Sequence, residues 1–200
     1  MIPRWQSFLV IGALTLGLAA CASPPINYYT LVPVATGSAS DVAVPVPFEL
    51  LPVGVPAQVD VPQLVIRQGG QDVVVLNGER WIAPLANEVH AALAAHLADA
   101  LGSQDLSGLP GSDQSRLRIK LDLRRFDSIA GQAALIDAVW SVRSLKGGAA
   151  VTCTSRLSEP VGPGYDALVQ GHQQAIARLA DEVADVARAV HADRTPSCPE

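Results

Sequence analysis

The sequence predicts an α/β (α+β) fold, a single domain in which two main helices pack on a mixed, mostly antiparallel sheet. Apolar and charged residues alternate from Arg116 to Arg125, which is the pattern of a strand with one buried face. Between Pro84 and Gly102, and again from about Tyr165 to His191, apolar residues recur at the three- and four-residue spacing of an amphipathic helix. Short glycine turns between the later strands indicate an antiparallel meander.

The N-terminal part of the predicted domain, which covers residues 27–192, contains short strands separated by loops. Asn27–Leu31 is rich in aromatic and β-branched residues and predicts a first strand. The segment 33–47 is rich in proline, alanine, serine and glycine and is expected to be a loop. Phe48–Val55 predicts a strand that Pro52 restricts to a sheet edge or interrupts.

A hairpin is predicted next: residues 59–63 lead into a strand over 64–67, and a turn that contains two glycines joins it to a strand over 73–76. Asn77-Gly78 then turns the chain out of the strand. Trp81–Pro84 opens the first helix, because proline is tolerated in a first helical turn, and Gly102 ends that helix.

The strand over 116–125 begins the meander. Phe126 breaks its alternation, so we expect a bulge or a bend near Arg125. Strands over 132–145 and 149–157 follow. The cationic face of the first strand is interpreted as a solvated sheet face, and the last helix as one that packs across the sheet in preference to forming a coiled coil.

The N-terminus has the order of a secretory signal. One cation, Arg4, precedes an apolar run from Phe8 to Ala20, which is shorter than the roughly 20 apolar residues of a transmembrane helix. Leu18-Ala19-Ala20-Cys21 resembles a bacterial lipobox. We therefore predict that residues 1–20 are a lipoprotein signal peptide.

Lipidation of Cys21 follows from this interpretation. The thiol would take a diacylglycerol and the new amino group an acyl chain, and several chains together give stable membrane anchoring. Residues 21–26 would form a lipidated tether. Ala22, where inner-membrane lipoproteins usually have Asp, favours the outer membrane. The alternative is a plain signal peptide cut after Ala20, with Cys21 as a structural residue.

Composition limits the possible partners. The mature chain from Cys21 would have 180 residues, enough for one domain with a real core. Its 13 cations against 19 acids give a net charge of −6 by simple count. An acidic chain without basic runs argues against nucleic acid and against anionic headgroups as electrostatic partners.

Two further cysteines, Cys153 and Cys198, have two interpretations. An exported protein meets an oxidising compartment, so the two could pair. Alternatively, Cys153 is a small core residue and Cys198 a thiol in a flexible tail over 193–200. Three cysteines this far apart have no metal-ligand spacing, so no metal site is predicted.

The motif search finds no catalytic group and no cofactor site. His90 and His96 lie about 220° apart around one helix and do not converge. The four histidines, which include His172 and His191, are interpreted as surface or boundary residues. A nucleophile elbow, a zinc-protease motif and a phosphate loop are absent from the sequence. We therefore expect a protein that is not an enzyme.

Glu79-Arg80-Trp81 is the most distinctive polar and aromatic cluster. One interpretation is a structural latch, in which the guanidinium and the indole close the hairpin over the helix start. The other is an exposed contact surface for a partner. The latch is preferred because tryptophan is normally mostly buried.

Three segments resemble the PqiC-like lipoproteins, also called ABC-type transport auxiliary lipoproteins. They are Tyr28-Tyr29-Thr30-Leu31 soon after a lipidated cysteine, the segment Val59–Arg67, and Arg80-Trp81-Ile82-Ala83-Pro84-Leu85 at the head of a helix. All three occur in the family's order. This sequence departs at Val61, where the family often has Arg, and at Ala83, where it often has Glu.

The resemblance implies an outer-membrane-anchored lipoprotein that faces the periplasm of a Gram-negative bacterium. Such a protein would work beside an MCE-domain protein, with an ABC permease and ATPase, in phospholipid transport between two membranes. It would be a docking component without a cofactor, and it could assemble as a homo-oligomer. Tyr28, Tyr29, Arg80 and Trp81 are then either fold-signature or partner-binding residues.

A second function from another class remains open. The protein could be an independent carrier of a lipid or small molecule, with its own pocket between the sheet and the helices. Abundant alanine along 91–100 would leave room for a ligand, although small residues equally permit close helix packing.

Overall fold

A computed structural model describes residues 25–34, 44–109 and 116–199. The predicted signal segment 1–20 and Cys21, the predicted lipidation site, lie outside the described residues. The helices are α2 (Leu85–Leu101) and α3 (Tyr165–His191). The strands are β1 (Asn27–Tyr29), β2 (Phe48–Leu50), β3 (Gln63–Gly69), β4 (Asp72–Trp81), β5 (Leu117–Ile129), β6 (Ala133–Ser144) and β7 (Val151–Pro160). Of the helices described, neither α2 nor α3 is long and apolar enough to cross a membrane.

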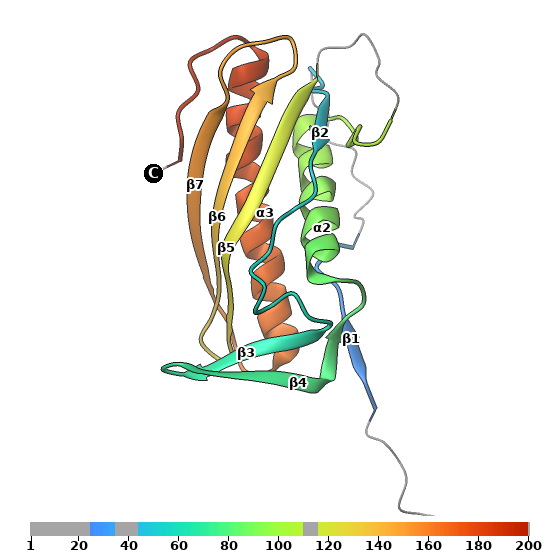
Figure 1. Cartoon of the computed structure of the whole chain (residues 1–200), viewed down its shortest axis with the longest axis vertical. Coiled ribbons are helices and arrows are strands. Elements are labelled where there is room, and N and C mark those ends of the chain that lie inside the picture. The colour runs from blue at the N-terminus through green and yellow to red at the C-terminus, as the bar shows by residue number, and fades with distance from the viewer. Residues whose placement is uncertain (1–24, 35–43, 110–115, 200) are drawn as a thin grey trace, which may run out of the picture.

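The α+β class is confirmed, and the strands divide into two sheets. The larger sheet has the order β2-β5-β6-β7, in which β2 runs parallel to β5 and the other neighbours are antiparallel. The smaller sheet has the order β1-β4-β3, with β1 parallel to β4. Figure 1 shows the smaller sheet at one end of the molecule, below the long strands and α3.

The core lies between the larger sheet and the two helices. Along β6 every second residue is buried and faces α3: Ala134, Ile136, Ala138, Trp140 and Val142. The seam of α3 packs on β5, β6, β7 and α2, so the prediction that this helix lies across the sheet is confirmed. Leucines of α2, among them Leu93 and Leu97, complete the same core.

The predicted bulge in β5 is present. The register between β5 and β6 shifts between Leu123 and Arg125, after which Phe126 points into the core. The extra residue places Arg124 and Arg125 both on the solvent side, because burying either guanidinium in an apolar core would be costly.

The prediction that Asn77-Gly78 turns the chain out of the sheet is wrong. β4 continues through these residues to Trp81, and α2 begins only at Leu85. The pairing with β3 absorbs them through an irregularity, since Val65 pairs with Val75 whereas Gln63 pairs with Arg80. Directly after them, Glu79–Trp81 pair with β1 on the other side of β4.

The segment that follows β1 is attached to both helices. The buried carboxylate of Glu88 in α2 accepts hydrogen bonds from the Thr30 hydroxyl and the Leu31 backbone N–H, each at 2.8 Å. The Gln173 amide of α3 donates to the Thr30 carbonyl at 3.0 Å. These contacts fix where the N-terminal strand enters the domain.

Cys153 and Cys198, whose pairing the sequence left open, form a disulfide with an S–S distance of 1.99 Å. The bond fastens the C-terminal segment, predicted to be flexible, to the buried side of β7. Closing a loop over a separation of 45 residues restricts the unfolded chain, which stabilises the fold by about 4 kcal/mol in the chain-entropy model.

We predict that Gly171→Ala destabilises the protein although alanine favours helices. A Cβ at this position of α3 would lie 2.3 Å from Val161 Cγ1 and 3.0 Å from the Ala134 Cβ. Overpacking of this kind costs about 1–3 kcal/mol, measurable by chemical unfolding. Gln170→Ala, one residue away and exposed, is the control and should change stability little. Equal stability of the Gly171→Ala variant and the wild type would contradict the close packing of α3 on β6.

Candidate docking site at the start of helix α2

The end of β4 separates the two residues of the predicted Arg-Trp cluster. Arg80 and Trp81 are consecutive in a strand, so their side chains point to opposite faces. Trp81 is 5% exposed, and its ring meets Phe126 edge-on at 6.2 Å. The Arg80 Nε donates to the Asn77 carbonyl at 3.4 Å and does not stack on the indole. Trp81 therefore packs as a core residue, while Arg80 lies at the surface.

The two tyrosines of β1 differ in the same way. Tyr29 is half-buried and donates its hydroxyl to Glu79 at 2.7 Å, and Asn27 donates to the same carboxylate at 3.1 Å. Burial raises the pKa of Tyr29 well above its usual range, and the bond to Glu79 raises it further. Tyr28, in contrast, is 57% exposed. Tyr29 holds β1 against β4, and Tyr28 is free for contact.

Tyr28 and Arg80 lie together at one side of a groove of about 410 Å³. The parallel register of β1 and β4 places them directly opposite each other. The groove continues along the loop before β3 and the first residues before α2, and Ile82 on its rim is 61% exposed. Its lining is Tyr28, Asp60, Val61, Pro62, Arg80, Trp81, Ile82, Ala83 and Pro84.

Of the four predicted site residues, Tyr28, Arg80 and Trp81 line the groove. Tyr29 is not among its lining residues. Sequence reasoning missed Ile82. Side chains alternate between the two faces of an extended chain, so Ile82 points outward because Trp81 points inward. This can be inferred only once β4 is known to extend to Trp81. The residues that line the groove offer apolar surface together with one cation, Arg80, and one acid, Asp60.

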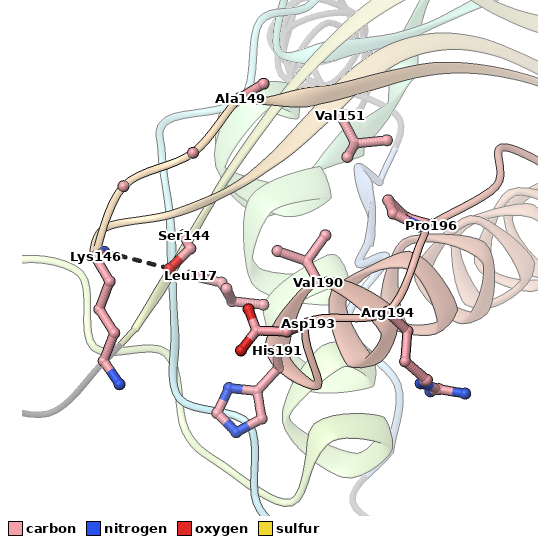
Figure 2. A pocket seen from close by; sticks show the side chains of 12 residues that line it. Leu117, Ser144, Lys146, Ala149, Val151, Val190, His191, Asp193, Arg194 and Pro196 are labelled. Atoms are coloured by element: carbon pink, nitrogen blue, oxygen red, sulfur yellow. Dashed lines mark hydrogen bonds between the residues drawn. The ribbon is translucent and has the colours of Figure 1, made fainter.

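A second hollow, of about 490 Å³, lies at the end of the molecule opposite β1 (Figure 1). Figure 2 shows Leu117, Val151 and Val190 along its apolar side. The charged ends of Lys146 and Arg194 point away from each other at its two sides. Because these groups do not converge on one point, the hollow is a weaker site than the groove.

A buried serine–histidine pair lies elsewhere, between β5 and α3. The Ser128 hydroxyl is hydrogen bonded to His172 Nε2 at 2.8 Å, and the imidazole stacks on Phe126 at 3.8 Å. The expectation that His172 is a surface or boundary residue is wrong, because it has no exposed surface. Burial lowers its pKa to about 3, and the nearby Asp127 carboxylate opposes this only weakly.

This pair is not equipped for catalysis. The ring is sealed from solvent, and His172 Nδ1 has no hydrogen-bond partner that would orient the imidazole as a base. Burial would raise the pKa of Asp127, but hydrogen bonds from Arg125 and Arg67 hold it below its usual range. Within the described ranges, no three His, Cys, Asp or Glu side chains come together as a metal site.

The protein is an α+β domain with a surface groove beside the start of α2, and comparison with known families places it more closely. The chain belongs to the family described as the ABC-type transport auxiliary lipoprotein component, whose model matches residues 29–184. The family resemblance inferred from the three sequence segments is thereby confirmed. No curated protein is similar enough in sequence to be matched to the chain.

Solved structures share the fold. A crystal structure of an uncharacterized protein has a TM-score of 0.65 and 23% identity, and covers 80% of this chain and 97% of its own. A Xanthomonas campestris protein described as DUF330 has a TM-score of 0.60 and 21% identity, with 79% of this chain and 92% of its own covered. At this level of identity the similarity shows the architecture alone.

We predict that His172 makes stability depend on pH between about 6.5 and 3. In this window the unfolded chain binds a proton at His172 and the folded protein does not, so stability falls as the pH falls, by about 1.4 kcal/mol per pH unit. Chemical unfolding of a Ser128→Ala/His172→Phe variant should show a flatter profile. Ser128→Ala alone keeps the histidine and should keep the slope. Identical slopes in all three proteins would refute the buried neutral imidazole.

Proposed function

We propose that the protein is an outer-membrane-anchored lipoprotein facing the periplasm of a Gram-negative bacterium. It acts as a non-catalytic auxiliary component of an MCE/ABC-type phospholipid transport system and docks to the MCE-domain partner. An ABC permease and ATPase complete the system. The observation that carries the proposal is the exposed groove at the start of α2, in a chain whose family is described as an auxiliary lipoprotein component of ABC-type transport.

The proposed anchor fits the position of the groove. Six peptide bonds separate Cys21 from Asn27 at the start of β1, and a chain of this length reaches at most about 20 Å. Tyr28 follows immediately and lines the groove. A lipid on Cys21 would thus hold the groove close to the membrane surface.

The lining of the groove suits a protein contact. Tyrosine and arginine are enriched among the residues that dominate interface energies, and an exposed isoleucine beside them adds apolar area. Tyr28, Arg80 and Ile82 supply this combination here. Tyr29 and Trp81 support it from beneath, because both are held by the fold.

The carrier alternative receives less support. A carrier needs a chamber between the sheet and the helices, but of the alanines over 91–100 only Ala92 is buried there, and it is packed in the core. Ala92 in α2 and Ala180 and Ala184 in α3 have no exposed surface, and the two helices are in direct contact. The small side chains thus allow close helix packing, which favours docking over carriage.

We predict that Cys21→Ala abolishes lipidation of the protein. The cut before a lipobox cysteine and both acylations need its thiol, so the variant should lose its palmitate label and keep residues 1–20, which the mass of the purified protein reveals. Separation of membrane fractions by density should place the wild type with the outer membrane, as Ala22 indicates. Palmitate labelling of the Cys21→Ala variant, or recovery of the wild type in the inner membrane, would contradict this part of the proposal.

We also predict that the full-length, C-terminally tagged lipoprotein recovers an MCE-domain protein or an ABC permease when it is purified in mild detergent. Ile82→Asp should reduce that recovery at least tenfold, because a charge replaces an apolar contact, and should leave the melting temperature unchanged because Ile82 is 61% exposed. Leu109→Asp, at a residue that is 58% exposed and outside the groove, is the matched control.

Two outcomes would count against docking. A wild-type preparation that contains only this protein and bound phospholipid would favour the independent carrier. Equal recovery of the partner by the Ile82→Asp and Leu109→Asp variants would move the docking site away from the groove.

A further inference from the structure

We propose that the open face of the larger sheet is a second interaction surface, which docks an acidic surface of the MCE-domain partner. This inference rests on the proposed function. The open face consists of the residues of β2, β5, β6 and β7 that point away from α2 and α3. Its charged members are Glu49, Arg118, Lys120, Asp122, Arg124, Arg125, Asp127, Asp137, Arg143 and Arg156.

The helices leave this face uncovered. The inward residues of β6 are at most 1% exposed and pack on α3, while the residues between them, such as Asp137 and Ser141, are at least partly exposed. Figure 1 shows α3 along one side of β5, β6 and β7. Among the described elements, β3 alone reaches the margin of the open face, where Arg67 pairs with Asp127 at 3.1 Å.

Charge is distributed unevenly between this face and the rest of the molecule. The open face has six cations and four acids, whereas the remaining described residues have seven cations and twelve acids. An acidic protein therefore presents one positive face. The sequence analysis identified the cationic face of β5 and interpreted it as a solvated sheet face, and the pairing of β5 with β6 and β7 adds Arg143 and Arg156 to it.

All four acids of the open face already contact a cation. Arg118 pairs with Glu49 and Arg125 with Asp127, and the Lys120 Nζ lies 3.2 Å from an Asp122 oxygen. Arg156 pairs with Asp137 at 3.4 Å. Arg124 and Arg143 are exposed and form no ion pair with any described residue. The net positive charge of the open face is thus located on the guanidinium groups of Arg124 and Arg143.

The backbone places each of these two arginines beside another arginine. The bulge in β5 sets Arg124 next to Arg125 on the same face. The register of β5 and β6 sets Arg143 directly opposite Arg118. Like charges at such positions destabilise a sheet. An acidic partner would relieve both repulsions, at two points about 20 Å apart along β5.

A protein fits this face better than a bilayer does. A bilayer of anionic lipid presents one sign of charge, and four carboxylates on the open face would oppose it. A protein surface can match both signs at fixed positions, which guides association and sets orientation.

The test is the association of the full-length lipoprotein, in mild detergent, with the purified MCE-domain protein of the same system. Interferometry at 50 and 300 mM NaCl compares the wild type with Arg124→Glu/Arg143→Glu. We expect the association rate constant to fall at least tenfold at 50 mM, and the difference to shrink at 300 mM because salt screens exposed charges. Arg124→Lys/Arg143→Lys keeps the charge and should restore association.

Lys146→Glu/Arg194→Glu is the matched control, because it makes the same change in net charge at two exposed residues outside the open face. Equal rate constants for the two Glu variants would overturn the inference and leave the proposed function intact. Failure of the wild type to bind the MCE-domain protein would overturn both. If the Arg124→Glu/Arg143→Glu variant bound the MCE-domain protein as the wild type does but no longer bound vesicles of phosphatidylcholine and phosphatidylglycerol (3:1), the open face would be assigned to the membrane instead.

Discussion

The carboxylate of Glu88 connects the N-terminal end of the chain to the rest of the domain. Burying a carboxylate is costly unless it is hydrogen bonded, and here the Thr30 hydroxyl and the Leu31 N–H both donate to it at 2.8 Å. Glu88 also lies in the first turn of α2, where the helix dipole favours a negative charge. With Thr30 and Leu31 fixed in this way, β1 can lie parallel to β4, and Tyr28 comes to lie opposite Arg80. The groove exists because these contacts hold.

The sequence predicted the meander and both helices well, because those elements carry their own periodicity. It did not predict which distant strands pair. β1 joins β4, and β2 joins β5, across separations that no local pattern encodes, and these parallel pairings divide the strands into two sheets. Asn77-Gly78 has the composition of a turn, yet the flanking residues are paired, Val75 with Val65 and Glu79 with Asn27, and β4 runs through without a break. Local propensity was overridden by tertiary contact.

The candidate site could be predicted only in part for the same reason. Tyr28 and Arg80 were identified as candidates, but whether each was structural or exposed depends on strand direction and register. Two adjacent residues of one type, Tyr28 and Tyr29, take opposite roles because they point to opposite faces. His172 was misassigned because its neighbours in sequence are polar, whereas Phe126 and Ser128, which enclose it, come from a strand more than forty residues earlier.

Anchoring changes what the two proposed surfaces need to achieve. A lipoprotein and a partner on the same membrane system meet at a high effective concentration, so each contact can be weak and the sum still specific. The groove supplies a small apolar contact with one arginine, and the open sheet face supplies charges whose pairing is sensitive to salt. A weak apolar contact near the anchor and an electrostatic contact along the sheet would together fix the orientation of the domain, which a single contact of either kind would leave free to rotate.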